Sequence, residues 1–87
     1  MKRPNDTVKA RMQFYQDLEA DKFSLSETVR RMRKIIGMNQ IEYAKFVGIA
    51  PRVLMDFERG TGNPTLQTLG KIGAPFGLTV LLRRVIK

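Results

Sequence analysis

The sequence lacks cysteine, histidine and tryptophan. Without cysteine the chain can form neither a disulfide nor a thiolate metal site, and without histidine it has no imidazole general base and no His-ligated zinc. It also lacks a paired-carboxylate motif and a glycine-rich phosphate loop, because the run Gly60-Thr61-Gly62 is too short and in the wrong context to be one. We therefore expect no enzyme activity, no metal and no cofactor.

Long hydrophobic runs are missing as well. Lys2 and Arg3 lie at the N-terminus, but no apolar stretch of signal-peptide type follows them. No stretch approaches the roughly 20 apolar residues that a membrane-spanning helix needs. We expect a cytoplasmic protein without a membrane partner, folded as one domain with a modest core.

Acidic residues are few compared with basic ones. The chain of 87 residues has 16 Lys and Arg against 8 Asp and Glu, a net charge of +8. Residues 1–24 hold five basic and four acidic side chains, whereas residues 25–87 hold eleven and four. A basic chain of this size suggests a polyanionic partner, nucleic acid rather than an acidic membrane surface. Because the excess of positive charge lies after residue 24, we expect that part of the chain to contact the partner.

Apolar residues at helical spacing predict a first helix over residues 6–21, capped by Asp6. Its expected apolar face contains Val8, Met12, Tyr15 and Leu18, with Phe14 and Phe23 nearby. This helix either packs on the main domain or serves as an interaction arm.

A second helix begins at a capping box of Ser24 and Glu27 and ends at Gly37, which supplies a left-handed stop. Its expected apolar face contains Leu25, Val29, Met32 and Ile36, and its opposite face contains Arg30, Arg31, Arg33 and Lys34. The cluster Arg30, Arg31 and Lys34 is either a solvated face that attracts DNA at long range or a direct phosphate contact.

Residues 40–60 are the most informative part of the chain. Asn39 and Glu42 form a second capping box, which opens a helix over about residues 40–47. Gly48 allows a sharp turn, and Pro51 suits the first position of the next helix because the missing N–H has no partner there. Two short helices joined by a tight turn are the layout that places a helix in the DNA major groove.

The C-terminal part combines a fourth helix and a β-type run. Thr65 caps a helix with an apolar stripe, and Gly77 ends it. The residues expected on this stripe are Leu66, Leu69, Ile72 and Phe76. Residues 78–86 then predict a strand, which must pair with something because a lone strand leaves its backbone groups unsatisfied. We expect it to pair with a second copy in a symmetric dimer, through Leu78, Val80, Leu82, Arg84 and Ile86.

A set of residues keeps a distinctive spacing: Gln40, Ala44, Gly48, Ile49, Leu54, Phe57, Glu58, Arg59, Gly60, Asn63, Pro64, Thr65, Leu66, Thr68, Leu69, Lys71 and Ile72. With them the chain resembles the lambda-repressor-like (Cro/XRE type) helix-turn-helix family over about residues 25–78. The terminal strand makes it look most like the antitoxin branch, as in the DNA-binding antitoxin of the HipA–HipB pair, where a similar strand pairs across the dimer.

The resemblance implies a mainly α fold of four to five helices, with a C-terminal β-strand that pairs across a dimer. Residues 1–24 would form an N-terminal helical extension, residues 25–78 the DNA-binding domain and residues 79–87 the dimerisation strand. The implied partners are double-stranded DNA, a second copy of the chain and, in the antitoxin branch, a cognate toxin protein.

The resemblance also assigns base-reading positions to the helix that starts at Pro51. Pro51, Arg52 and Asp56 match positions that face base edges. The fork of Arg52 can bond guanine O6 and N7 together, and Met55 and Val53 can touch thymine methyl groups. The carboxylate of Asp56 is repelled by phosphates unless it accepts from cytosine N4, and it can instead pair with Arg52, four residues before it on the same face.

Further positions match contacts to the DNA backbone and contacts within the protein. Gln40 and Arg59 match phosphate contacts, and a helix N-terminus such as that at Gln40 suits a phosphate. The alternative for Gln40 is a solvated residue at a helix start. Arg33 and Glu58 match a buried ion pair between the second helix and the recognition helix.

Ile41 and Phe46 have no place on the core face of their helix, which Tyr43, Ala44 and Val47 already fill. Either the N-terminal helix covers one of them, or they mark a protein-binding patch. The leading hypothesis is thus a homodimeric DNA-binding transcriptional regulator, a repressor acting on a palindromic operator. The alternative is an antitoxin whose main role is to bind a toxin, with DNA binding secondary.

Overall fold

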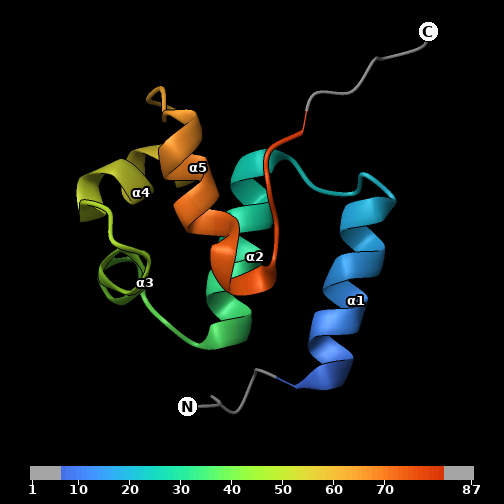
Figure 1. Cartoon of the computed structure of the whole chain (residues 1–87). Coiled ribbons are helices and arrows are strands. Elements are labelled where there is room, and N and C mark those ends of the chain that lie inside the picture. The colour runs from blue at the N-terminus through green and yellow to red at the C-terminus, as the bar shows by residue number, and fades with distance from the viewer. Residues whose placement is uncertain (1–6, 82–87) are drawn as a thin grey trace, which may run out of the picture.

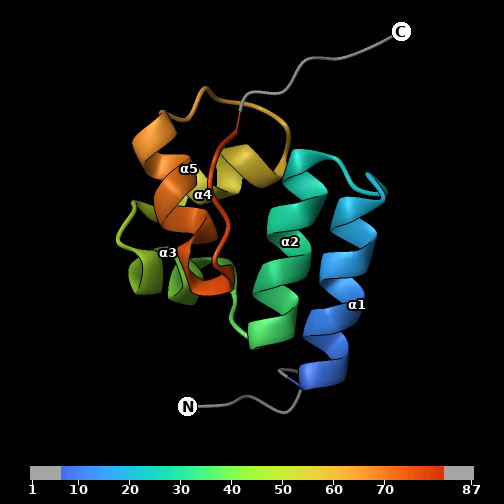
Figure 2. The same ribbon diagram turned by 45° about the vertical axis from the view of Figure 1, so that its right-hand side comes forward.

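The computed structural model describes residues 7–81 of the chain. In this part, five α-helices are followed by a short 3-10 helix (Figure 1): α1 (Val8–Glu19), α2 (Leu25–Ile36), α3 (Gln40–Val47), α4 (Pro51–Glu58), α5 (Leu66–Gly73) and η1 (Ala74–Phe76). The helix α2 occupies the centre, with α1 antiparallel along one side and α3, α4 and α5 packed on the other (Figures 1 and 2). The mainly helical fold expected from the sequence is confirmed.

Both predicted capping boxes are present. Ser24 Oγ accepts from the backbone N–H of Glu27 at 3.2 Å, and Glu27 Oε1 accepts from that of Ser24 at 3.1 Å. The backbone N–H of Ser24, and then its hydroxyl, hold the pKa of Glu27 below its ordinary value. Asn39 and Glu42 repeat the arrangement at 2.8 and 2.9 Å. These local bonds set where α2 and α3 begin, so both starts were readable from the sequence.

The first helix differs from the prediction in its start and its orientation. Its cap is Thr7, whose hydroxyl accepts from Ala10 at 3.0 Å, whereas the predicted cap Asp6 lies outside the described residues. Phe14 is fully buried, while Val8 and Met12, expected on the apolar face, are largely exposed. Tyr15 and Leu18, also expected on that face, do pack against the core. The buried face of α1 is therefore turned toward Phe14 relative to the prediction, because helical spacing alone does not decide which neighbouring residues meet the rest of the domain.

The exposure of Leu25 and Leu66 also contradicts the predicted apolar faces. Each is the first residue of its helix, and each is more than half exposed. On α2, Thr28 and Ile35 are buried in addition to the residues expected there.

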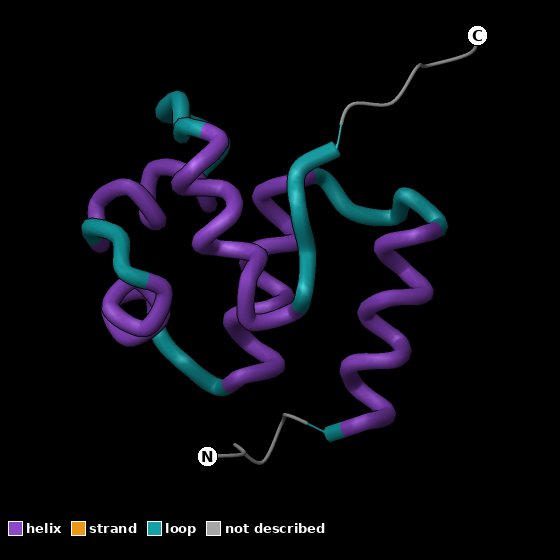
Figure 3. The backbone as a smooth tube through the Cα atoms, viewed as in Figure 1, coloured by secondary structure: helices purple, strands orange, loops and turns teal. Residues whose placement is uncertain are grey.

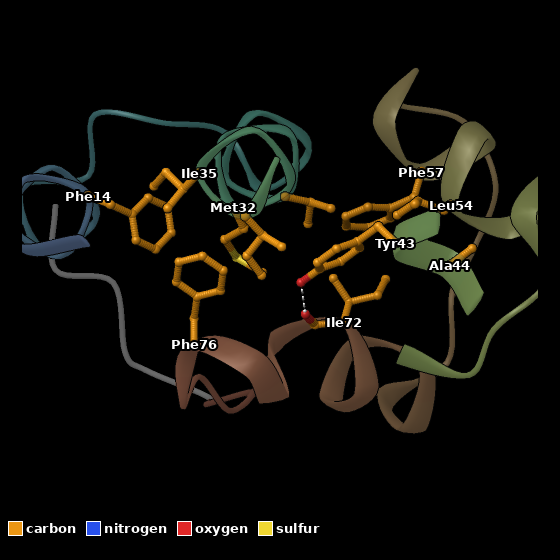
Figure 4. Packing of buried hydrophobic residues seen from close by; sticks show 11 residues of the cluster. Phe14, Met32, Ile35, Tyr43, Ala44, Leu54, Phe57, Ile72 and Phe76 are labelled. Atoms are coloured by element: carbon orange, nitrogen blue, oxygen red, sulfur yellow. Dashed lines mark hydrogen bonds between the residues drawn. The ribbon is translucent and has the colours of Figure 1, made fainter. Parts of the chain in front are cut away.

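The hydrophobic core joins all the helices (Figure 4). Its buried members are Phe14, Val29, Met32, Ile35, Ile36, Tyr43, Ala44, Leu54, Phe57, Ile72 and Phe76. Phe14 meets Phe76 edge-on with ring centroids 5.2 Å apart, and the hydroxyl of Tyr15 donates to the carbonyl of Phe76 at 2.7 Å. The helix α1 is therefore packed on the domain, the first of the two arrangements expected for it.

A buried hydrogen bond crosses the centre of the core. The hydroxyl of Tyr43 donates to the carbonyl oxygen of Ile72 at 2.7 Å, which links α3 to α5 (Figure 4). Burial raises the pKa of Tyr43, so this hydroxyl keeps its proton at any physiological pH.

The predicted C-terminal strand is wrong for the residues that the structure describes. Within residues 7–81 the chain forms no strand, and its last segment is irregular (Figure 3). The backbone N–H of Leu78 donates to the carbonyl of Gly73 at 3.0 Å, and the half-buried Leu78 packs against the core. Val80 is exposed and has no strand beside it, because a single chain offers no partner edge. The other residues predicted for this strand, Leu82, Arg84 and Ile86, lie outside the described range.

In the described part of the chain, no helix combines the length and the apolar composition needed to cross a membrane.

Candidate nucleic-acid interface

The unit formed by α3, a tight turn and α4 has the predicted geometry. Gly48 ends α3 at φ 82°, and its N–H and that of Ile49 both donate to the carbonyl of Ala44 at 2.9 Å. The helix α4 then starts with Pro51, after Ala50, which gives no side-chain cap. The left-handed Gly48 and the helix start at Pro51 together change the direction of the chain within three residues.

The inner face of α4 fixes the direction of its outer face. Leu54 is fully buried and Phe57 nearly so, both in the core beside Tyr43 and Ala44 of α3. The two helices therefore form one packed unit, in which α4 cannot rotate without exposing these side chains.

The outer face of α4 contains the residues predicted to read DNA. Arg52 and Arg59 are exposed, and Pro51, Met55 and Asp56 are partly exposed. Residues 52, 55, 56 and 59 have the spacing of neighbours on one helix face, so they form a single stripe. Arg52 makes no hydrogen bond or ion pair with any residue in the range 7–81, so its guanidinium is available to a ligand.

The ion pair on this stripe is not the one expected. Arg59 Nη2 donates to Asp56 Oδ1 at 2.7 Å, three residues apart on the helix. The sequence allowed a pair between Arg52 and Asp56 instead, and the structure contradicts that alternative. A carboxylate that is held by Arg59 brings less uncompensated negative charge toward DNA than a free one.

A buried network around Glu58 joins α2, α3 and α4. Glu58 is only 3% exposed, and Arg33 donates to both of its oxygens, from Nε at 2.9 Å and from Nη2 at 3.1 Å. Gln40 Nε2 donates to Glu58 Oε1 at 3.2 Å. The structure thus brings together Arg33 and Glu58, the residues expected to pair, and adds Gln40 to them.

Arg30 belongs to the same network, which the sequence did not reveal. Its Nη2 donates to the backbone carbonyl of Glu58 at 2.6 Å, and its Nε lies 3.8 Å from Glu58 Oε1. From the sequence, Arg30 was expected on a basic face that is either solvated or in direct contact with phosphate. Its spacing from Arg33 could have indicated that Arg30 also faces Glu58, because residues three apart share a helix face. Arg30 therefore stabilises the carbonyl end of α4, where a cation is favourable.

Gln40 lies at the N-terminus of α3 with its side chain held in one orientation. One of the two N–H groups of its amide points to Glu58, and the residue is partly exposed. The other N–H is not used by that bond, so it remains available to a ligand near the start of α3.

Ile41 and Phe46 stay exposed on α3, at 49% and 57%. The helix α1 lies on the opposite side of α2 from α3 (Figures 1 and 2). The expectation that the N-terminal helix covers one of these two residues is therefore wrong.

The comparisons with known proteins agree with this geometry. The model of a helix-turn-helix family matches residues 29–81, more than half of the chain. The HTH-type transcriptional regulator DdrOP3 of Deinococcus deserti is 36% identical over 56 residues, which cover 64% of this chain and 43% of that protein. The chain thus spans less than half the length of this relative. No solved structure gives a significant match. Since the family match runs from α2 past η1 and includes the whole α3–turn–α4 unit, the chain belongs to this helix-turn-helix family.

Proposed function

We propose that this protein is a DNA-binding transcriptional regulator that places α4 in the major groove. The observation that carries the proposal is the outward stripe of α4, whose guanidinium at Arg52 is free of partners among the described residues while its inner face is locked in the core. The net charge of +8 suits a polyanionic partner, and the matching relative is itself a transcriptional regulator.

The residues of the stripe would divide into base readers and backbone contacts. Arg52 would bond guanine O6 and N7 with its fork, and Pro51 and Met55 would give apolar contacts to the neighbouring bases. Gln40 would donate its second amide N–H to a phosphate at the start of α3, where the helix dipole favours an anion. Arg59 would contact a phosphate with the N–H groups that Asp56 does not use.

A homodimer on a palindromic operator is the form in which we expect the protein to act as a repressor. An apolar groove of about 320 Å³ lies between α2, α5 and residues 78–81, and the exposed Leu25, Val80 and Leu81 line it. A second copy that covered this surface would bury these side chains, which is favourable. To bind a palindromic operator, such a two-fold dimer would have to place its two α4 helices about 34 Å apart, one turn of DNA.

The first prediction concerns Arg52. Selection from a random duplex pool should enrich an inverted repeat for the wild type, and Arg52→Ala should lose the preference at one base pair of each half-site. The expected loss is about 1–3 kcal/mol of discrimination, with general DNA affinity largely kept. Lys9→Ala on α1 is the control, since it removes one exposed cation far from α4. An Arg52→Ala protein that selects the wild-type sequence would exclude Arg52 as a base reader.

An antitoxin role is the second candidate, and the exposed pair Ile41 and Phe46 favours it. A toxin protein encoded beside this gene would be the partner, with DNA binding secondary. Co-expression with that neighbour should give a stable complex, and Phe46→Ser should weaken it while Met12→Ser, a change at an equally exposed site on α1, should not. If neither change affects complex formation, Phe46 is not part of the contact.

A further inference from the structure

Asp56 is the one acidic side chain on the outward stripe of α4, since the other carboxylate of this helix, Glu58, is buried. Arg59 Nη2 donates a hydrogen bond to Oδ1 of Asp56 at 2.7 Å. The second carboxylate oxygen, Oδ2, accepts no hydrogen bond from the residues that the structure describes. The side chain is about one-third exposed, so this oxygen can be reached from outside.

The loop after α4 limits where this carboxylate can turn. The N–H and the hydroxyl of Thr61 both donate to the carbonyl of Asp56, at 2.9 and 3.0 Å. A methyl group added at Gly62 would lie 3.3 Å from the Cβ of Asp56, so the loop backbone approaches the side chain closely. The loop thus fixes the backbone and the Cβ of Asp56, and Arg59 holds one oxygen of its carboxylate.

The chemistry of the major groove then selects the base. Guanine presents two acceptors and thymine one, so both repel a carboxylate, and adenine places its N7 acceptor beside its amino donor. Cytosine presents only the N4 amino group as a donor, which suits an oxygen that can only accept. Arg59 offsets part of the negative charge that would otherwise be repelled by the phosphates.

We propose that Asp56 is a specificity-determining residue that reads cytosine through its N4 amino group, with Arg59 as its positioning residue. The inference rests on the proposed function, because it names a base that the same face of α4 selects. Asp56 follows Arg52 by four residues, a rise of about 6 Å along the helix. The operator half-site should therefore contain a cytosine about two base pairs from the guanine that Arg52 reads.

The test compares the sequences that the full-length wild type and the variant Asp56→Asn select from a random duplex pool. Asparagine bonds adenine at N6 and N7, so the variant should change the preferred base at one position of each half-site from cytosine to adenine. At that position the wild type should prefer cytosine by about tenfold or more, and the variant should reverse this order. Asp17→Asn on α1 makes the same charge change far from α4 and should leave the selected sequence as it was.

Arg59 provides a second readout that a simple phosphate contact does not move. Arg59→Gln should lower the affinity for all sequences and also reduce the cytosine preference several-fold. Arg59→Lys, which keeps a cation near Asp56, should restore much of that preference. If Arg59→Gln weakens binding equally for every base, Arg59 does not position Asp56.

The outcomes separate this inference from the proposed function. A wild type that selects no sequence overturns both. A wild type that selects a motif, together with an Asp56→Asn protein that prefers the same base at every position, supports the regulator and overturns the role of Asp56. A general gain in affinity that Asp17→Asn reproduces would show that Asp56 acts only through its charge.

Discussion

At the scale of single residues, Glu58 connects the DNA-facing surface to the interior. Its carboxylate accepts from Arg33 and Gln40, and its backbone carbonyl accepts from Arg30. Two cations surround one buried carboxylate, so the network keeps a positive excess at the junction of α2 and α4. The same carboxylate fixes the amide of Gln40, which makes the phosphate contact proposed for Gln40 dependent on Glu58.

Replacement of Glu58 by glutamine should therefore destabilise the fold strongly. Glu58→Gln leaves the partly buried Arg33 without its charge partner, and we expect a loss of about 3 kcal/mol in the free energy of unfolding. Urea denaturation followed by circular dichroism measures it. Glu19→Gln, on the exposed end of α1, makes the same chemical change and should stay within about 0.5 kcal/mol. Equal midpoints for the two variants would contradict the structural role of the network.

Tyr43 gives a prediction on pH. Its folded pKa is raised by burial above the ordinary value near 10, so the unfolded state loses the proton first as the pH rises. The stabilisation by Tyr43 is complete below about pH 10 and decreases above it by up to about 1.4 kcal/mol per pH unit. Tyr43→Phe should be less stable than the wild type by about 1–3 kcal/mol at pH 7, because the carbonyl of Ile72 loses its donor. Urea denaturation should show this difference shrinking above pH 10, and a constant difference would contradict it.

At the scale of secondary-structure elements, the turn between α3 and α4 decides how the recognition surface is presented. Gly48 adopts φ 82°, and no atom lies within 4 Å of a Cβ added there. Glycine is therefore favoured here because the backbone is left-handed, and not because a side chain would collide with a neighbour. Any other residue at this position has to adopt a left-handed conformation that is unfavourable for a side chain.

Alanine substitutions at two glycines should consequently have opposite signs. Gly48→Ala should lower the free energy of unfolding by about 1 kcal/mol through its left-handed backbone. Gly70→Ala is the matched control, because Gly70 lies inside α5 with open space around it, and it should stabilise by about 0.5–1 kcal/mol. Thermal unfolding of the pair tests this, and a stabilising Gly48→Ala would refute the required turn.

Features set by interactions between residues close in the sequence were predicted correctly, and features set by distant contacts were predicted only in part. The capping boxes at Ser24 and Asn39 and the stop at Gly48 involve residues three or four positions apart, so the sequence predicted them correctly. The buried face of α1 and the path of the chain after Leu78 depend on contacts with distant segments. The prediction for α1 was right for Tyr15 and Leu18 and wrong for Val8 and Met12, and the strand predicted after Leu78 does not form within the described residues.

The candidate interface shows the same division. The base-reading positions on α4 were assigned by the resemblance to the helix-turn-helix family. The burial of Leu54 and Phe57, which the sequence did predict, leaves these positions on the outer face. The pairing of Asp56 was predicted incorrectly, since Arg52 and Arg59 are both within reach on one helix face and spacing alone does not choose between them. Arg30 was missed because its partner, the end of α4, is far away in the sequence.

At the scale of the whole molecule, the surfaces proposed for DNA and for a second copy are formed by different elements. The helices α3 and α4 lie on one side and α1 on the other (Figures 1 and 2). The groove beside Leu25 and Leu81 is lined by Leu18 of α1, by α2 and α5 and by the last described residues, not by α3 or α4. A second copy bound at the groove would therefore leave the outward stripe of α4 available to DNA.

The proposed dimer predicts how binding responds to salt. The logarithm of the affinity falls with the logarithm of salt concentration by about 0.9 for each phosphate neutralised. A dimer neutralises the phosphates of two half-sites in one event, so the slope on the complete inverted repeat should be about twice the slope on a duplex with one half-site. Fluorescence anisotropy between roughly 50 and 200 mM salt measures both slopes. Monomers that bind independently would instead give the same slope on both duplexes, and that result would leave the recognition surface intact while excluding the dimer.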